Sequence, residues 1–120
     1  MIGKWHGLVM DCSSPSELAK FYEQVLGYMR VYDDPDWVVI GITREQPGIA
    51  FQKIENYKPS TWPTDVVPTQ MHLDVKVDDL QVGLEQAEAI GAKLLNKSSD
   101  TFWVLADPEG HPFCLVKLDD

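Results

Sequence analysis

Basic residues are scarce in this sequence, and that scarcity excludes one class of partner. The 120 residues hold 10 Lys and Arg against 19 Asp and Glu, which gives a formal net charge of −9. A protein that neutralises a nucleic-acid backbone needs clustered Lys and Arg. We therefore expect no nucleic-acid partner and no attraction to an anionic membrane, whereas a cationic small ligand would be attracted.

Several other features are missing as well. The two cysteines, Cys12 and Cys114, are too few and too far apart for a disulfide framework, so we expect two reduced thiols buried in strands. No apolar run reaches membrane-spanning length, and no basic segment leads into an apolar run near the N-terminus. We expect a cytoplasmic protein. The sequence also has no glycine-rich phosphate loop, nucleophile elbow or Cys-x-x-Cys pair.

What is present suffices for one compact domain over residues 1–120. Apolar residues make up 44% of the chain and charged residues 24%, as in ordinary globular proteins. Ser14 suits a helix N-cap, Pro15 the first helical position and Gly27 the left-handed residue that ends the helix. The first unit, about residues 4–54, thus combines this helix with predicted strands at residues 4–12, 28–32, 37–42 and 49–54.

The same order of elements returns after a Pro-, Thr- and Asn-rich linker at residues 55–69. Asp78 is the expected N-cap of the second helix and Gly91 its end, while Asp107–Gly110 fits a type I turn. The second unit, about residues 70–118, has predicted strands at residues 71–77, 93–97, 101–106 and 112–118. The sequence therefore predicts an α+β fold of two β-α-β-β-β units.

Three segments carry a family resemblance. Residues 14–27, 71–80 and 107–113 resemble motifs of the vicinal oxygen chelate superfamily, which includes glyoxalase I and the bleomycin-resistance proteins. The resemblance implies two β-α-β-β-β units whose sheets join into a curved mixed sheet, a cup with the helices outside. It also implies paired subunits, so we expect a homodimer. Many members hold a divalent metal with one ligand from the first strand and one from the last strand of each unit.

At the positions implied for those ligands, this sequence has only two residues that are good metal ligands. Matching the two units places them at Gly7, Gln52, His72 and Cys114. Gly7 has no side chain and Gln52 is a weak neutral oxygen ligand, whereas His72 and the Cys114 thiolate are competent. His6 would need a bulge to replace Gly7, because neighbouring strand residues face opposite ways. Roles without a metal are favoured by the pattern: His72 as a histidine lining the cup beside Asp74, and Cys114 as an inert buried thiol.

Strand alternation brings further side chains to the cup. In the first strand of the second unit, His72, Asp74 and Lys76 should face it, and in the first unit Asp11 should. Asp11 is either a base or ligand-binding carboxylate or the partner of Lys76 in an ion pair. Four aromatic residues could form stacking walls for a planar or cationic ligand: Trp37, Trp62, Trp103 and Tyr57.

These observations favour a glyoxalase-like small-molecule-binding protein with a degraded metal site, which would bind or sequester an organic or antibiotic-like ligand. No metal is favoured, no catalytic residue is assigned, and His72 and Cys114 are the weak metal candidates. The alternative is a divalent-metal-dependent lyase, isomerase or dioxygenase of the superfamily. A third role, protein interaction, would require a cup filled by its own side chains.

Overall fold

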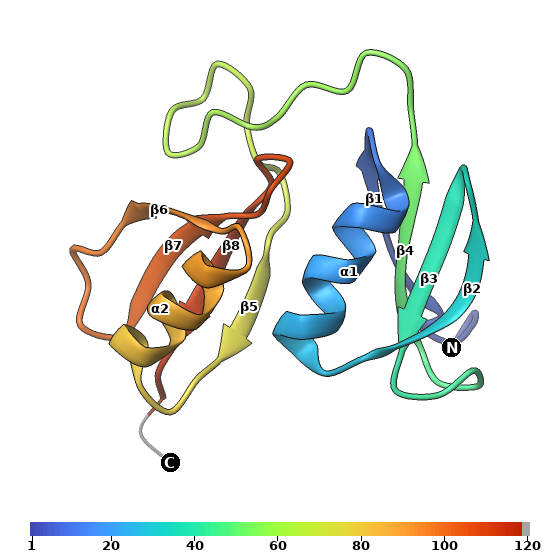
Figure 1. The fold of residues 1–120 in the computed structure, drawn as a ribbon, viewed down its shortest axis with the longest axis horizontal. Coiled ribbons are helices and arrows are strands. Elements are labelled where there is room, and N and C mark those ends of the chain that lie inside the picture. The colour runs from blue at the N-terminus through green and yellow to red at the C-terminus, as the bar shows by residue number, and fades with distance from the viewer. Residues whose placement is uncertain (119–120) are drawn as a thin grey trace. The chain divides into compact units, whose positions relative to one another are not determined.

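The computed structural model describes residues 1–118 and divides into two compact units, Met1–Tyr57 and Lys58–Asp120. Figure 1 shows that each unit consists of a strand, a helix and three more strands, which confirms the predicted α+β architecture. The bounds in the first unit are β1 Gly7–Cys12, α1 Pro15–Leu26, β2 Met29–Asp34, β3 Trp37–Gly41 and β4 Gly48–Lys53. Those in the second are β5 Leu73–Lys76, α2 Leu80–Ala89, β6 Lys93–Asn96, β7 Phe102–Ala106 and β8 Pro112–Val116.

The first unit is a four-stranded sheet with α1 on one face. Its strand order is β1-β4-β3-β2, with β1 parallel to β4 and the other pairs antiparallel. Tyr22 of α1 stacks on Phe51 of β4 at 5.8 Å between ring centroids. Val38 and Ile40 of β3 point the same way as Phe51 and are fully buried. We call the opposite face, which α1 does not cover, the open face of the sheet.

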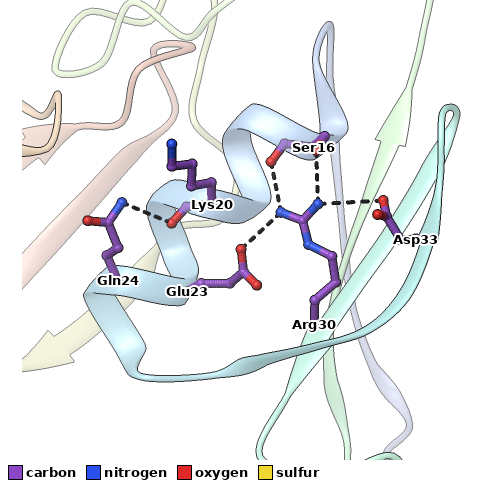
Figure 2. Close-up of polar contacts among 6 residues, drawn as sticks. All are labelled: Ser16, Lys20, Glu23, Gln24, Arg30 and Asp33. Carbon is purple, nitrogen blue, oxygen red and sulfur yellow. Dashed lines mark hydrogen bonds and ion pairs between the residues drawn. The ribbon is translucent and has the colours of Figure 1, made fainter.

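Arg30 of β2 connects this sheet to α1, as Figure 2 shows. One guanidinium nitrogen bonds the Glu23 carboxylate at 2.9 Å and the Ser16 carbonyl at 3.0 Å. The other donates to the Ser16 hydroxyl at 2.9 Å and lies 3.5 Å from Asp33. Because the planar guanidinium presents several donors in a fixed geometry, one side chain holds the first and the last turn of the helix to the strand.

The second unit repeats the arrangement. Its strand order is β5-β8-β7-β6, with β5 parallel to β8 and the other pairs antiparallel. Leu115 of β8 faces α2, because a side chain added at Gly83 of that helix would lie against the Leu115 methyl group. Phe113 shares that face and is fully buried. The open face of this sheet therefore carries Asp74 and Cys114.

The helix termini follow their local sequence with one correction. Ser14, Pro15 and Gly27 take the predicted places, and Gly27 has a φ of 69°. For α2, however, the N-cap is Asp79 and not Asp78, because the Asp79 carboxylate accepts the Val82 N–H at 2.9 Å. The turn after β7 is confirmed by the Gly110 N–H, which donates to the Asp107 carbonyl at 2.9 Å.

The strand pairing also corrects the match between the two units. In β5 and β8, Asp74 lies opposite Cys114, and the corresponding pair in β1 and β4 is Val9 with Ala50. Ala50, two residues before Gln52, is therefore the counterpart of Cys114. A shift of two residues keeps the side chain on the same face, so alternation alone could not reveal the error.

In residues 1–118, no helix is both long enough and apolar enough to span a membrane.

Candidate functional site

Three side chains of types that can bind a metal meet on the open face of the second unit. His72 lies just before β5, Asp74 in β5 and Cys114 in β8. Their ligand atoms all lie within 4.8 Å of one another. The parallel pairing produces this cluster, since it sets Asp74 directly opposite Cys114 and leaves His72 two residues earlier on the same face. The fold thus brings together three of the separately predicted candidates, His72, Asp74 and Cys114.

The His72 ring is held from two sides. Its Nδ1 lies 3.3 Å from the Asp74 carboxylate. The Trp62 indole stacks on it with ring centroids 5.3 Å apart and planes 15° from parallel. Asp74 therefore orients one ring nitrogen while Trp62 covers one ring face, an arrangement that fixes the imidazole plane.

Cys114 is strongly disposed to remain a neutral thiol. Burial raises the pKa of Cys114 to about 11, and the charge and hydrogen bond of Asp74 add to that rise. Only 3% of the residue is exposed. Since the thiolate is the nucleophilic form, Cys114 is poorly suited to attack a substrate by itself.

The donor set of the trio fits a borderline metal ion such as Zn²⁺. Imidazole nitrogen, carboxylate oxygen and thiolate sulfur are the ligands that Zn²⁺ accepts, at about 2.0–2.3 Å. Atoms within 4.8 Å of one another could share one such ion after a small closing movement of the side chains. The corresponding first-unit positions, Gly7 and Ala50, offer no side-chain donor. Among residues 1–118, the group of side chains that could hold a metal therefore belongs to the second unit.

A pocket of about 300 Å³ lies in the first unit, on the open face of its sheet. Its residues come from all four strands, from His6 before β1 and from the turn between β3 and β4. Small and apolar side chains form the floor, while Trp37 and Tyr32 supply aromatic surface. The lining consists of His6, Gly7, Leu8, Val9, Val31, Tyr32, Trp37, Val39, Ile40, Arg44, Gln46, Gly48 and Ala50.

The remaining first-unit candidates, Asp11, Gln52 and Tyr57, do not line this pocket. Asp11 and Gln52 face each other across β1 and β4, and the Gln52 amide donates to the Asp11 carboxylate at 3.1 Å. Trp37 is paired with Gln52, so the two polar residues lie next to the aromatic end of the pocket. Tyr57, the last residue of the unit, is half-buried and is not part of the lining.

Trp103 does not lie on the open face of the second unit, contrary to its expected place. It pairs with Leu115, which faces α2, and paired residues share a face. Its indole N–H donates to the Ser99 carbonyl at 2.9 Å. The tryptophans predicted to line one cup therefore lie in three different places. Trp62 covers His72, Trp37 lines the first-unit pocket, and Trp103 packs on the helix side.

Sequence reasoning missed several pocket residues. Arg44 and Gln46 were not identified because they lie in a turn, where no alternation indicates direction. One signal was available: β1 is parallel to β4, so the turn preceding β4 lies at the same end of the sheet as His6. His111, at the end of the turn before β8, has its Nδ1 2.8 Å from the buried Asp107 carboxylate.

Two β-α-β-β-β units, with a donor cluster and a pocket on the faces opposite their helices, define the chain as a protein of the vicinal oxygen chelate class. A family model, the glyoxalase-like domain, matches residues 7–116, and the chain belongs to that family. No curated protein matches the sequence.

Solved structures share the fold at low sequence identity. A glyoxalase/bleomycin resistance protein/dioxygenase family enzyme from Burkholderia phytofirmans PsJN is 17% identical with a TM-score of 0.74, over 98% of this chain and 100% of that one. Fosfomycin resistance protein FosX from Mesorhizobium loti is 15% identical with a TM-score of 0.69, over 99% and 94%. FosX from Listeria monocytogenes, an E126Q mutant complexed with Mn(II) and dihydroxypropylphosphonic acid, is 12% identical with a TM-score of 0.71, over 97% and 90%.

Proposed function

We propose that this glyoxalase-like protein binds a small organic molecule in the pocket of its first unit. The observation that carries the proposal is the pocket itself: about 300 Å³ with a mostly apolar floor, aromatic surface and a few polar groups. Concave sites with this composition are the usual form of small-ligand sites. The glycine and alanine at the implied metal positions of this unit support binding that needs no metal there.

The aromatic and the polar lining residues would have different roles in binding. Trp37 and Tyr32 give flat apolar surface that a planar ligand can cover, and their burial would drive association. His6, Arg44 and Gln46 supply hydrogen-bond donors that fix the orientation of the ligand. Nothing in this set is arranged as a nucleophile with an adjacent base, so the pocket is built for binding and not for covalent catalysis.

A ligand screen with a matched pair of variants tests this proposal. In a thermal-shift screen of small planar compounds, some compounds should raise the melting temperature of the protein. Calorimetry with those compounds should then give a stoichiometry of about one binding site per chain. Trp37→Ala should weaken binding at least tenfold, because Trp37 lines the pocket. Trp5→Ala should leave the affinity unchanged, since Trp5 is 69% exposed and outside the lining. Equal loss in both variants would contradict the proposal.

A second candidate function, a metal-dependent reaction of the lyase, isomerase or dioxygenase type, is favoured by the cluster of His72, Asp74 and Cys114. FosX from Listeria monocytogenes has been crystallised with Mn(II), which makes a divalent ion a reasonable ligand for a related fold. When bound, such an ion supplies Lewis-acid activation of a substrate oxygen. The chain's own contribution is to orient His72 through Asp74 and Trp62 and to give up the proton of Cys114.

Metal titration separates the two candidates. If the second is right, calorimetry with Zn²⁺ or Mn²⁺ should give about one site per chain, and His72→Ala and Cys114→Ala should each remove it. His6→Ala serves as the control, because His6 lies in the other unit and outside the cluster. Unchanged metal uptake in His72→Ala would exclude this cluster as the site.

A further inference from the structure

We infer that the first-unit pocket selects a planar or aromatic compound that carries an anionic group, of which a carboxylate is the simplest. This inference rests on the proposed binding function and adds the chemical class of the ligand. It reverses the expectation from net charge, because the formal charge of −9 describes the whole chain and not the pocket. The pocket lining contains Arg44 and His6 but no Asp or Glu.

The strand register places the polar and aromatic residues at opposite ends of the pocket. Gly7 pairs with Gly48, so His6 and the turn that carries Arg44 and Gln46 lie at one end of the sheet. Trp37, at the first position of β3, is paired with Gln52 and lies at the other end. A ligand that uses both ends therefore needs a charged or polar terminus and a flat apolar body.

The charge of Arg44 favours one orientation of the ligand. Among residues 1–118, Arg44 has no carboxylate in ion-pair contact, so its positive charge is not neutralised by the protein. At the other end, Trp37 offers an aromatic surface and no positive charge. An anionic group is therefore attracted to the Arg44 end, and the Arg guanidinium suits a carboxylate with its parallel N–H donors.

The floor between the ends accepts a flat ring. Gly7, Gly48 and Ala50 present at most a methyl group on the open face. A side chain at Gly7 would come within 2.7 Å of the Gly48 carbonyl, and one at Gly48 would meet the Ile40 carbonyl, so both positions require glycine. Tyr32 and Val39, paired across β2 and β3, bound this floor on one side. The flat strip therefore leads from the cationic end to the aromatic end.

Three compounds of one shape provide the test: 2-naphthoate, 2-naphthamide and 2-naphthylmethylammonium. Calorimetry on the full chain at low salt should show 2-naphthoate binding at least tenfold more tightly than the other two. Arg44→Glu should weaken 2-naphthoate at least tenfold and leave 2-naphthamide within twofold. Lys53→Glu is the matched control, because it changes net charge equally at an exposed residue outside the lining. It should leave 2-naphthoate binding within twofold.

Other results would overturn the inference in distinguishable ways. If 2-naphthamide or the ammonium compound binds as tightly as 2-naphthoate, and Trp37→Ala weakens them, the pocket binds aromatic ligands but the anionic preference is wrong. If Arg44→Glu and Lys53→Glu weaken 2-naphthoate equally, only the overall charge acts and Arg44 has no role. If none of the three binds at millimolar concentration, both the inference and the proposed binding function fail for planar ligands of this size.

Discussion

Asp74 lies directly opposite Cys114 in the parallel pairing of β5 and β8, and its carboxylate acts on the thiol by charge and by a hydrogen bond. Both effects raise the pKa of Cys114, although burial is the larger cause. A single carboxylate therefore orients the His72 ring and adds to the burial that keeps the neighbouring sulfur protonated. In the absence of a metal, this cluster is a proton-bearing and not a nucleophilic arrangement.

Removing the charge of Asp74 should lower the pKa of Cys114. In Asp74→Asn the coulombic cause disappears while burial persists, so the pKa should fall from about 11 but stay above the ordinary 9.0. Cysteine labelled with ¹³C at Cβ reports this titration by NMR and separates Cys114 from Cys12. Asp100→Asn, a matched exposed change, should leave the midpoint alone. An unmoved midpoint in Asp74→Asn would show that Asp74 has no effect on the thiol.

The same pKa gives stability a particular dependence on alkaline pH. The folded chain holds the Cys114 proton up to about pH 11, whereas an unfolded chain releases it near pH 9.0. The unfolded state therefore binds fewer protons in this window, and the free energy of unfolding falls as pH rises from about 9 to 11. Over two pKa units the loss approaches about 2–3 kcal/mol.

Urea unfolding at pH 8, 9, 10 and 11 measures this slope. Cys114→Ala should show a shallower fall than the natural chain, whatever its stability at pH 8. Cys12→Ala is the companion variant, because that cysteine is also buried but has no Asp74 beside it. Identical slopes in Cys114→Ala and the natural chain would contradict the assigned pKa.

Arg30 should contribute measurably to the stability of the first unit. Arg30→Ala removes charge-assisted bonds to Glu23 and Ser16 and exposes the helix end that they hold (Figure 2). We expect a loss of about 1–2 kcal/mol in the free energy of unfolding, measured by urea denaturation. Arg30→Lys should recover only part, because an ammonium cannot reach the same partners together. Full recovery by Lys would mean that charge alone matters.

The N-cap of α2 can be tested by comparing the stability of variants at two neighbouring aspartates, Asp79 and Asp78. Asp79→Ala removes the carboxylate that accepts the Val82 N–H and should cost about 1 kcal/mol of unfolding free energy. Asp78→Ala should change stability by less than half as much, because Asp78 lies before the cap. Thermal denaturation of the two variants under one set of conditions decides between them, and the reverse order would restore the sequence-based assignment.

A structural feature could be predicted from the sequence when it depends on residues close together in the chain. Helix starts, the turn at Asp107 and the faces of β1 and β5 follow from residues within a few positions, and these were predicted correctly apart from a one-residue error at Asp79. The match of Gln52 to Cys114 was wrong, because a two-residue slip preserves every inward and outward direction. Only hydrogen-bond register between strands distant in sequence reveals it.

The site residues also divide into those that a local pattern predicts and those that depend on tertiary contacts. His72, Asp74 and Cys114 were found because alternation places them on one face. Trp103 was misplaced because the next three residues of β7 are all buried and apolar, so alternation did not show which face Trp103 takes until its pairing with Leu115 was known. Arg44 and Arg30 were missed because their roles come from contacts made by a turn and by a helix packed against a strand. Such contacts are tertiary, and no periodic pattern encodes them.

The last prediction is that a larger side chain on the floor of the first-unit pocket, at Ala50, blocks ligand binding. Ala50 is 7% exposed and points to the open face between Val9 and Val39, its partners in β1 and β3. Ala50→Leu adds three carbons that project into the pocket without entering the core beneath α1. We expect ligand binding to weaken at least tenfold in calorimetry while the free energy of unfolding changes by less than about 1.5 kcal/mol.

Gln52→Leu is the control for Ala50→Leu, because it adds apolar volume on the same face of β4 but outside the lining. It should leave ligand affinity within threefold. If Ala50→Leu bound ligand normally while remaining folded, the ligand would have to lie elsewhere, and the open face of the second unit, with His72 beneath Trp62, would become the place to map next by NMR shift perturbation.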